Sequence, residues 1–327
     1  MTTPSSPTGV LVMAHGTPSD PADIESFYTR IRRGSPPTPE LLAELTGRYE
    51  AIGGTSPLTE RTRAQVDGLA AALEDVAPGS YRVALGTKYT VPTIEEGLAE
   101  LAGAGVDRIV AVVLTPHQSS LGSGEYFRRA VSAAEEAPGT IDMVTVPSWH
   151  RAPGLAELLA ARLEAVMALK GTGDGRDTAV FFTAHSLPER VVAAGDPYPD
   201  QVAESAADIA GVLGLDTTPG VTWGVAWQSA GRTADPWIGP DLLMEIRRVA
   251  ADGARTVVVC PVGFVSDHLE VLFDLDIEAV QVADAVGVSF ARTPSLNDDP
   301  EFLRILAGVV HRADSEDRAD RDPARLP

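Results

Sequence analysis

A histidine at the end of an apolar run and three regularly spaced acids are the residues best suited to chemistry in this sequence. The run AVFFTAHSLPER, from Ala179 to Arg190, reads as a buried parallel strand that ends at His185. In PVGFVSDHLEVLFDLDIE, a loop leads into a predicted helix that carries Glu270, Asp274 and Glu278. At about 3.6 residues per turn, positions spaced by four lie along one face of a helix.

An imidazole that faces a ladder of carboxylates is suited to binding a divalent cation and to moving protons. Taken alone, a histidine such as His185 is more often structural, and most acid runs are solvated faces. No lysine or arginine stands between the three acids to relieve their repulsion, which costs a few tenths of a kcal/mol per neighbouring pair. The pattern therefore favours a functional site.

Length, charge and cysteine content narrow the class of protein. A chain of 327 residues is long enough for two domains. Its net charge of -20 argues against nucleic acid as a partner, because phosphates require a basic surface. No apolar run is long enough for a membrane span, and the start, MTTPSSPTG, lacks the features of a signal peptide. We expect a cytoplasmic protein in which the single cysteine, Cys260, is a small buried hydrophobe.

The two halves of the chain repeat one plan. VLVMAHGTP around His15 matches VFFTAHSLP around His185, and the later strands and helices keep the same order. The 170-residue spacing (185 minus 15) is typical of a duplicated domain. Strands that alternate with helices predict an α/β fold of two similar Rossmann-like lobes, each a parallel sheet flanked by helices. Ligands of such sheets bind beyond the carboxyl ends of the strands, so His15 and His185 are expected to face a cleft between the lobes.

The predicted boundaries follow from this repeat. We expect an N-terminal lobe over residues 1–150 and a C-terminal lobe over 151–312, whose last helix packs back on the first lobe. Residues 313–327 are charged and poor in apolar side chains, which predicts a disordered tail.

Several common functional motifs are missing from the sequence. There is no Walker loop, and HGTPSD after the first strand is not a dinucleotide-binding pattern. No CxxC or Cys/His spacing indicates a structural zinc site. AHSLP is not a nucleophile elbow, because Ser186 lacks the flanking glycines.

Seven strings in fixed order resemble one family, the ferrochelatases, and within it the bacterial branch that metallates coproporphyrin III. The resemblance covers Gly9 to about Val310, and the strings are GVLVMAHGTP, RRG, RYEAIGGTSPL, AHSLPER, GDPYPDQ, WQSAGRTADPWIGPD and PVGFVSDHLEVLFD. It implies a lyase that inserts Fe2+, as a substrate, into a porphyrin held between the two lobes.

The resemblance also implies roles for individual residues. His185 and Glu270 match the catalytic histidine and glutamate, and together with Asp274 and Glu278 they match the residues that handle the metal and the released protons. The positions that contact the porphyrin and its propionates are matched by His15, Arg32, Arg48, Tyr49, Ser56 and Tyr126.

The chemistry of metallation agrees with these residue types. Pyrrole nitrogens lose protons while the cation loses water, so the site needs a base with a pKa near neutrality and anionic oxygens, and histidine with carboxylate supplies both. Arginine forms paired hydrogen bonds to carboxylates such as propionates.

The sequence departs from the family pattern at two places. His15 stands where the coproporphyrin branch usually has a tyrosine associated with axial contact to the iron product, and imidazole is a nitrogen ligand that suits iron and other transition metals. Lys88 and Tyr89 stand where the family has a lysine and a histidine. With one cysteine the chain cannot hold the iron-sulfur cluster of some relatives, so we expect no permanently bound cofactor.

Two other functions remain open at this level. One is a chelatase for another pair, such as protoporphyrin IX with iron or sirohydrochlorin with cobalt. The other is a heme-binding carrier without turnover, for which His15 would be suitable. The expected partners are the porphyrin, ferrous iron and a transient downstream heme-pathway enzyme, with neither nucleic acid nor a membrane span.

Overall fold

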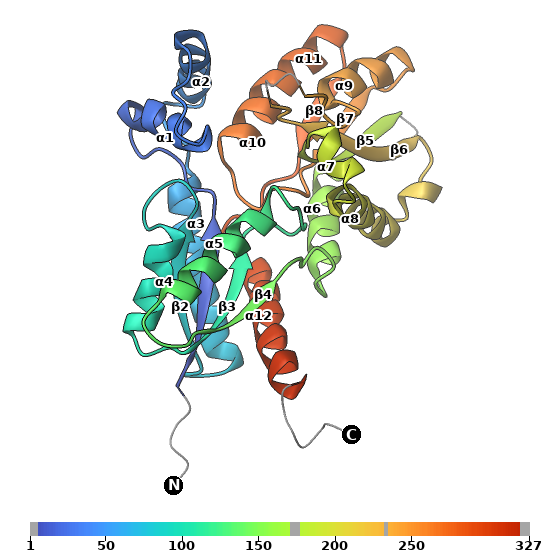
Figure 1. The fold of residues 1–327 in the computed structure, drawn as a ribbon. Helices are drawn as coiled ribbons and strands as arrows, with labels where there is room; N and C mark the ends of the chain where they lie inside the picture. Colours follow the sequence, from blue (N-terminus) through green and yellow to red (C-terminus); the bar gives the residue numbers. More distant parts are fainter. Residues whose placement is uncertain (1–5, 171–176, 232–234, 321–327) are drawn as a thin grey trace. The chain divides into compact units, whose positions relative to one another are not determined.

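The computed structural model describes residues 6–170, 177–231 and 235–320 (Figure 1). The chain divides into two compact units. The first comprises the described residues up to Pro116, then Ser120–Ala152 and residues 297–320. The second comprises His117–Ser119 and the described part of Pro153–Leu296.

The first unit is built on a four-stranded parallel sheet of order β2-β1-β3-β4. Its strands are β1 (Thr8–Ala14), β2 (Tyr81–Thr87), β3 (Arg108–Val113) and β4 (Asp142–Val146). The strands β1 and β3 are buried along their whole length, as expected for Val-rich inner strands covered on both faces. Its helices are α1 (Ile24–Ile31), α2 (Pro39–Ala51), α3 (Leu58–Val76), α4 (Ile94–Gly103), α5 (Ser123–Glu136) and α12 (Pro300–Asp320).

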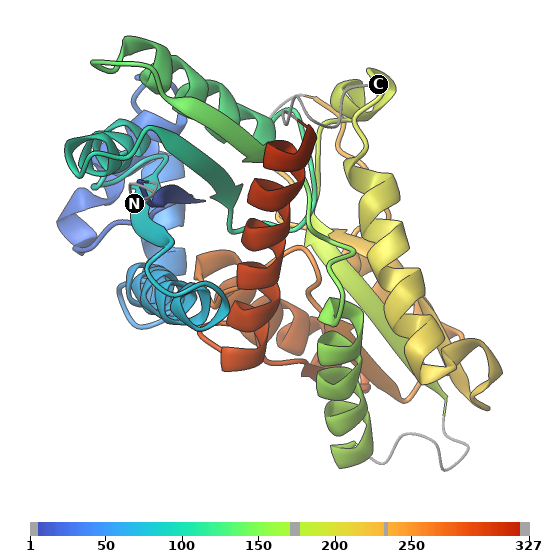
Figure 2. The ribbon, with the colours of Figure 1, turned by 90° about the horizontal axis from the view of Figure 1, so that it is seen from below.

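Helices cover both faces of this sheet. The side chains of α4 and α5 form one core with β1, β2 and β3. On the other face α3 lies beside α12, the last helix of the chain (Figure 2). Their contact is close, because a Cβ added at Gly68 of α3 would lie 2.3 Å from Leu303 Cδ1 of α12. Thus α12 belongs to the first unit; the sequence division numbered it with the second lobe but expected it to pack back on the first.

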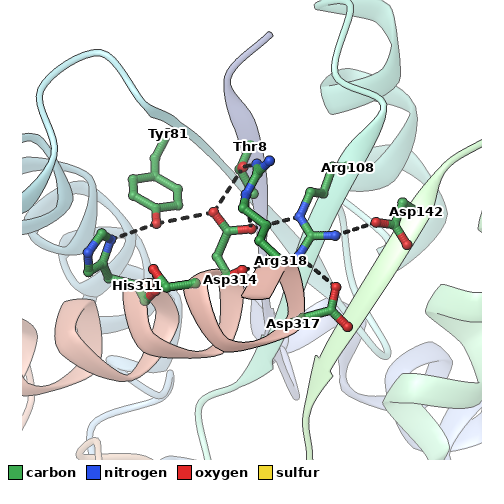
Figure 3. Close-up of polar contacts among 9 residues, drawn as sticks. Thr8, Tyr81, Arg108, Asp142, His311, Asp314, Asp317 and Arg318 are labelled. Atoms are coloured by element: carbon green, nitrogen blue, oxygen red, sulfur yellow. Dashed lines mark hydrogen bonds and ion pairs between the residues drawn. The ribbon is translucent and has the colours of Figure 1, made fainter. Parts of the chain in front are cut away.

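A buried arginine fixes the far end of α12 (Figure 3). Arg108, at the start of β3, donates from Nε to Asp314 Oδ1 at 2.7 Å and from Nη2 to Asp317 Oδ2 at 2.8 Å. Asp314 also accepts from Thr8 Oγ1 at 3.2 Å, and Tyr81 Oη lies 2.9 Å from His311 Nδ1. The predicted disorder of residues 313–320 is therefore wrong: charged residues that look solvated in the sequence are ion-pair partners of a buried arginine. Residues 321–327 of that predicted tail lie outside the described residues.

The second unit repeats the topology with the strand order β6-β5-β7-β8, again parallel. Its strands are β5 (Thr178–His185), β6 (Val221–Gln228), β7 (Thr256–Cys260) and β8 (Ser289–Arg292). In both sheets the first strand lies between the second and the third. The second strand is added on one side of it and the third on the other, so the strand order switches sides at β1 and at β5. The carboxyl ends at such a switch point are where open α/β sheets bind ligands.

The helices of the second unit include one irregular segment. They are α6 (Leu155–Leu169), α7 (Glu189–Ala193), α8 (Tyr198–Leu213), α9 (Leu242–Ala251), α10 (Leu269–Phe273) and α11 (Val280–Val286). Between α10 and α11 the backbone forms a π-helix over Asp274–Ala279. One core joins α9, α10, the π-helix and α11 to the sheet. Within the described residues, no helix has both the length and the apolar character needed to cross a membrane.

Candidate active site

His185 is the last residue of β5, at the carboxyl end of the inner strand. Its Nδ1 lies 2.6 Å from the carbonyl oxygen of Ser186. A carbonyl can only accept a hydrogen bond, so Nδ1 carries a proton and Nε2 is the nitrogen presented to the site. Nε2 lies 3.6 Å from Glu270 Oε1, and about a third of each side chain is exposed. The structure therefore brings the two predicted catalytic side chains together.

Glu270 stands in the first turn of α10 and has an imidazole on each side. While Oε1 faces His185, Oε2 lies 3.6 Å from Nε2 of His268. The ring of His268 is itself oriented by its own Nδ1, 3.0 Å from the carbonyl oxygen of Ser266. His268 was not among the predicted site residues, although it lies inside the DHLE string, two residues before Glu270. A histidine at the N-cap of the helix that carries an acid was the signal that could have identified it.

The charges of this group shift the two pKa values in opposite directions. Burial opposes ionisation of Glu270, but the charge and hydrogen bond of His185, with those of His268, hold the pKa of Glu270 well below its usual range. Burial also opposes protonation of His185, but the charge and hydrogen bond of Glu270 outweigh it and raise the pKa of His185 to about 9. At neutral pH the substrate-free pair is thus an imidazolium and a carboxylate. The sequence predicted a base with a pKa near neutrality, but in this substrate-free geometry the pKa of His185 is higher.

The predicted ladder of acids does not continue as one regular α-helical face. Asp274 and Glu278 lie in the π-helix, whose i to i+5 hydrogen bonds place more residues in each turn, so a spacing of four no longer repeats on one face. Asp274 is buried and accepts a hydrogen bond from Ser229 Oγ, and its charge helps to raise the pKa of His185. In the described part of the chain, no three His, Cys, Asp or Glu side chains are placed to hold a metal ion. The four-residue metal set stays a prediction.

In the first unit, His15 directly follows β1 and has the same local geometry as His185. Its Nδ1 lies 3.0 Å from the carbonyl oxygen of Gly16. The ring is held edge-on by Tyr89, with centroids 4.8 Å apart, and by Phe27, with centroids 6.0 Å apart. Gly16 has a φ of +82°, and a Cβ there would lie 2.2 Å from Thr90 Oγ1, so the turn after His15 requires glycine.

Two of the other predicted porphyrin-binding residues, Tyr49 and Tyr126, contact residues that lie next to His15 in the chain or pack against its ring. Tyr49 is buried at the end of α2, and its hydroxyl lies 3.2 Å from Thr17 Oγ1, two residues after His15. Tyr126 is buried in α5, and its ring lies 5.2 Å from Lys88 Nζ, which also lies 5.0 Å from the ring of Tyr89.

The remaining predicted contacts are local to their own segments. Ser56 is buried, and its hydroxyl accepts from the Leu58 N–H at 3.3 Å. Arg48 lies in the last turn of α2. Arg32 follows α1, donates to the Ser35 carbonyl oxygen at 3.3 Å and stacks on Tyr28 at 5.7 Å. The role of these three residues in porphyrin binding stays a prediction.

Comparison with known proteins gives consistent matches over nearly the whole chain. Residues 7–314 match a family model described as Ferrochelatase. A ferrochelatase of Thermus thermophilus is 43% identical over 321 residues, covering 93% of this chain and 98% of that protein. A coproporphyrin III ferrochelatase of Bacillus pumilus is 41% identical over 305 residues, covering 92% of this chain and 96% of that protein. The resemblance inferred from the seven strings is thereby confirmed.

Solved structures agree on the fold. SirB from Bacillus subtilis, solved with Fe3+, matches with a TM-score of 0.58 at 14% identity, over 96% of this chain and 98% of that chain. CbiX, described as the terminal enzyme for biosynthesis of siroheme in denitrifying bacteria, matches with a TM-score of 0.53 at 15% identity, over 93% and 99%. The predicted fold class, two similar lobes that are each a parallel sheet flanked by helices, is confirmed by these matches and by the two sheets themselves.

Proposed function

Because this chain belongs to the ferrochelatase family, we propose that it inserts ferrous iron into coproporphyrin III to give the iron porphyrin, as a step of heme biosynthesis. The observation that carries the proposal is the pair of His185 Nε2 and Glu270 Oε1, 3.6 Å apart at the carboxyl end of the inner strand. The porphyrin nitrogens give up two protons, the iron stays ferrous, and the protein must receive both the cation and the protons.

The low pKa of Glu270 and the raised pKa of His185 suggest an order of events. The anionic carboxylate of Glu270 attracts the hydrated cation and replaces part of its water. An approaching divalent charge disfavours the imidazolium, so His185 releases its proton and Nε2 becomes able to take one from a pyrrole nitrogen or to bind the iron. In this proposal Asp274 and Glu278 carry metal inward or protons outward along the π-helix.

The test is an anaerobic insertion assay with ferrous iron and coproporphyrin III. We expect turnover by the wild-type protein, and His185→Ala should abolish it while porphyrin binding changes little. His311→Ala, a change in α12 of the first unit, is the matched histidine control and should keep its insertion rate. Near-normal insertion by His185→Ala would contradict the site assignment.

The same assay separates the alternative functions. A carrier would bind heme without metallating coproporphyrin, and a chelatase of another class would prefer cobalt with sirohydrochlorin or iron with protoporphyrin IX. Propionate binding by Arg32, Arg48, Tyr49, Ser56 and Tyr126 predicts a lower KM for coproporphyrin III than for protoporphyrin IX, which lacks two of those carboxylates.

We further propose that His15 holds the iron of the product. Its protonated Nδ1 is anchored on the Gly16 carbonyl, an arrangement that commonly orients metal-binding imidazoles through Nε2. His15→Tyr should therefore change the absorption spectrum of the bound product and its dissociation rate, measured by transfer to an apo heme-binding protein. Unchanged spectra and rates would refute this role.

The reaction takes place in the cytoplasm, iron is a substrate, and the product passes transiently to a downstream heme-pathway enzyme. The single cysteine, Cys260, is buried and burial raises its thiol pKa to about 12. One buried thiol cannot supply the several ligands of an iron-sulfur cluster.

A further inference from the structure

We propose that Arg292 is a positioning residue for Glu270: its guanidinium holds two aspartates, one on each side of Glu270 in the chain, and so fixes where that carboxylate stands against His185. Arg292 is the last residue of β8, an edge strand of the second sheet. Its partners are Asp267, two residues before the start of α10, and Asp276, in the π-helix. The inference rests on the proposed function, in which Glu270 and His185 are catalytic, and adds a residue that acts through them.

Arg292, Asp267 and Asp276 form a clamp in which one guanidinium contacts both carboxylates. It donates to Asp276 from two nitrogens, Nε to Oδ1 at 2.7 Å and Nη2 to Oδ2 at 2.8 Å, a paired geometry that lysine cannot provide. Nη2 also lies 3.3 Å from Asp267 Oδ1. Asp267 Oδ1 accepts in addition from the buried Ser295 hydroxyl at 2.8 Å, which orients this carboxylate. Two residues nine positions apart in the chain (276 minus 267) are therefore held on one group.

The residues between the two anchors carry the chemistry proposed for this unit. Glu270, Asp274 and His268, the second imidazole beside Glu270, all lie between Asp267 and Asp276. That stretch consists of α10, which is five residues long, and the start of the π-helix. A helix this short has little stability of its own, and π-helical turns are rare, so contacts with the rest of the unit must hold this backbone in place.

Each edge of the second sheet supplies one such contact to the π-helix. Ser229, directly after β6, donates from its hydroxyl to the buried Asp274. Arg292, at the end of β8, donates to Asp276. The strands β6 and β8 are the two outer strands of the order β6-β5-β7-β8, so the acids of the π-helix are fixed from both edges of the sheet.

The guanidinium of Arg292 is itself held in place and largely removed from water. Thr293 donates its backbone N–H to the β7 residue Val259 at 2.8 Å, and its carbonyl oxygen accepts from Arg292 Nη1 at 3.2 Å. Only 14% of the Arg292 side chain is exposed. Burial opposes its charge, but the hydrogen bonds and charges of Asp276 and Asp267 outweigh burial and raise the pKa of Arg292, which stays a cation.

The space beside the clamp gives its ion pairs a positional role. A hollow of about 440 Å³ borders the clamp, and Asp267, Asp276 and Arg292 lie on its wall. Without the guanidinium the two carboxylates would repel each other, and this space would allow them to separate. The ion pairs therefore set the spacing of the two anchors and, through it, the position of the segment that carries Glu270.

Arg292→Met is the direct test, because it removes the charge and the paired donors and keeps a side chain of similar length. We expect kcat for iron insertion to fall about tenfold, the scale of a slightly displaced catalytic group, while the porphyrin KM changes less than about twofold. The matched control is Arg248→Met in α9, which also removes a guanidinium that bridges two carboxylates, those of Glu245 and Asp252. It should leave kcat unchanged.

The pKa of His185, measured by NMR in substrate-free protein, separates positioning from a direct effect of charge. Against the effect of burial, Glu270 raises the pKa of His185 to about 9, so displacement of that carboxylate should shift the pKa down. Loss of the Arg292 cation acts in the opposite direction, because it leaves two aspartates that favour the imidazolium. A lower pKa of His185 in Arg292→Met therefore reports movement of Glu270, and Arg248→Met should show no shift.

A second variant covers the case in which Arg292→Met folds poorly. Asp276→Asn removes only the anchor in the π-helix and should lower kcat at least about threefold, whereas Asp252→Asn, which removes one partner of Arg248 in the same way, should not. Equal kcat in these two variants would overturn the inference. A folded Arg292→Met protein with wild-type kcat, or with a pKa of His185 that is unchanged or raised, would overturn it as well.

Failure of the clamp is distinguishable from failure of the proposed function. If the clamp alone is wrong, wild-type protein inserts iron, His185→Ala abolishes insertion, and Arg292→Met behaves like Arg248→Met. If the proposed function is wrong, wild-type protein does not insert iron into coproporphyrin III at all. The pKa of His185 then still decides whether Arg292 positions Glu270, because that measurement needs no turnover.

Discussion

The two units of this protein share one sheet topology but use the ends of their strands differently. In each, a histidine ends or follows the inner strand, and its Nδ1 lies on the carbonyl oxygen of the next residue: 3.0 Å for His15 and 2.6 Å for His185. In each, the helix after the third strand carries a glutamate in its first turn, Glu125 in α5 and Glu270 in α10. The duplicated topology therefore supplies the same two chemical groups twice.

What differs is the residue opposite the histidine on the neighbouring strand. In the first unit Lys88, which follows β2, forms an ion pair with the Glu125 carboxylate, and Arg33 lies 3.9 Å from it. In the second unit the residue paired with His185 is Gln228, whose amide donates to the Glu270 backbone carbonyl at 3.4 Å.

The consequence is electrostatic. Burial opposes ionisation of Glu125, but the hydrogen bond and charge of Lys88 outweigh it and lower its pKa, so this carboxylate is neutralised by a fixed cation. For Glu270, the two groups that lower its pKa most, His185 and His268, are both imidazoles. An imidazole, unlike a lysine, can give up its proton near neutral pH. One topology thus yields a permanent ion pair in one unit and an exchangeable one in the other.

The largest expected effect within this comparison comes from removing the carboxylate of the exchangeable pair. Glu270→Gln should slow insertion at least about a hundredfold, the usual scale of a lost acid-base group. The control is Glu125→Gln, which removes the corresponding carboxylate of the first unit and should change kcat less than about threefold. Equal losses in the two variants, measured in the same anaerobic assay, would show that the distinction between the units is wrong.

The same substitution tests the coupling of His185 to Glu270 without turnover. A histidine whose folded pKa is raised, from 6.5 to about 9, adds stability that is complete below pH 6.5 and is lost as the pH rises through 9. The Tm of substrate-free wild-type protein should therefore fall across that window. In Glu270→Gln the fall should flatten, and NMR titration should find the pKa of His185 shifted down from about 9.

An intermediate effect is expected from giving the second unit the cation of the first. Gln228→Lys would place an ammonium beside Glu270, where it competes with the incoming iron. We expect kcat/KM for ferrous iron to fall about tenfold, because the ammonium should weaken the attraction of the carboxylate for the cation by about the free energy of one pKa unit. Gln228→Met removes the amide without adding charge and is the control. If it loses as much activity, charge is not the cause.

The sequence predicted the parts of this arrangement that depend on local pattern. Val-rich β3 and β7 and the histidines at strand ends follow from burial and strand length, and the pairing of His185 with Glu270 follows from the position of both after inner strands. The π-helix was not predicted, because the apolar spacing around Asp274 also fits an α-helix. The length of α12 was not predicted either, since the partner of Asp314 is Arg108, which lies 206 residues away in the chain.

The smallest effect is expected from removing the permanent cation of the first unit. Lys88→Met keeps the volume of the side chain but leaves Glu125 without its main partner and takes the charge from beside the Tyr89 and Tyr126 rings. Because Glu125 is partly exposed and water can solvate it, we expect a stability loss of about 1–2 kcal/mol. The porphyrin KM should rise a few-fold through Tyr126, with kcat nearly unchanged.

Lys88→Arg should restore most of that stability, since the ion pair can re-form. The comparison of the two units requires that Lys88 act on binding and stability, because its carboxylate partner is neutralised before any substrate arrives. A kcat loss in Lys88→Met as large as that of Glu270→Gln would place the Lys88–Glu125 pair in the chemical step. It would also mean that the first unit uses its glutamate as the second does, with the lysine as the group that exchanges a proton.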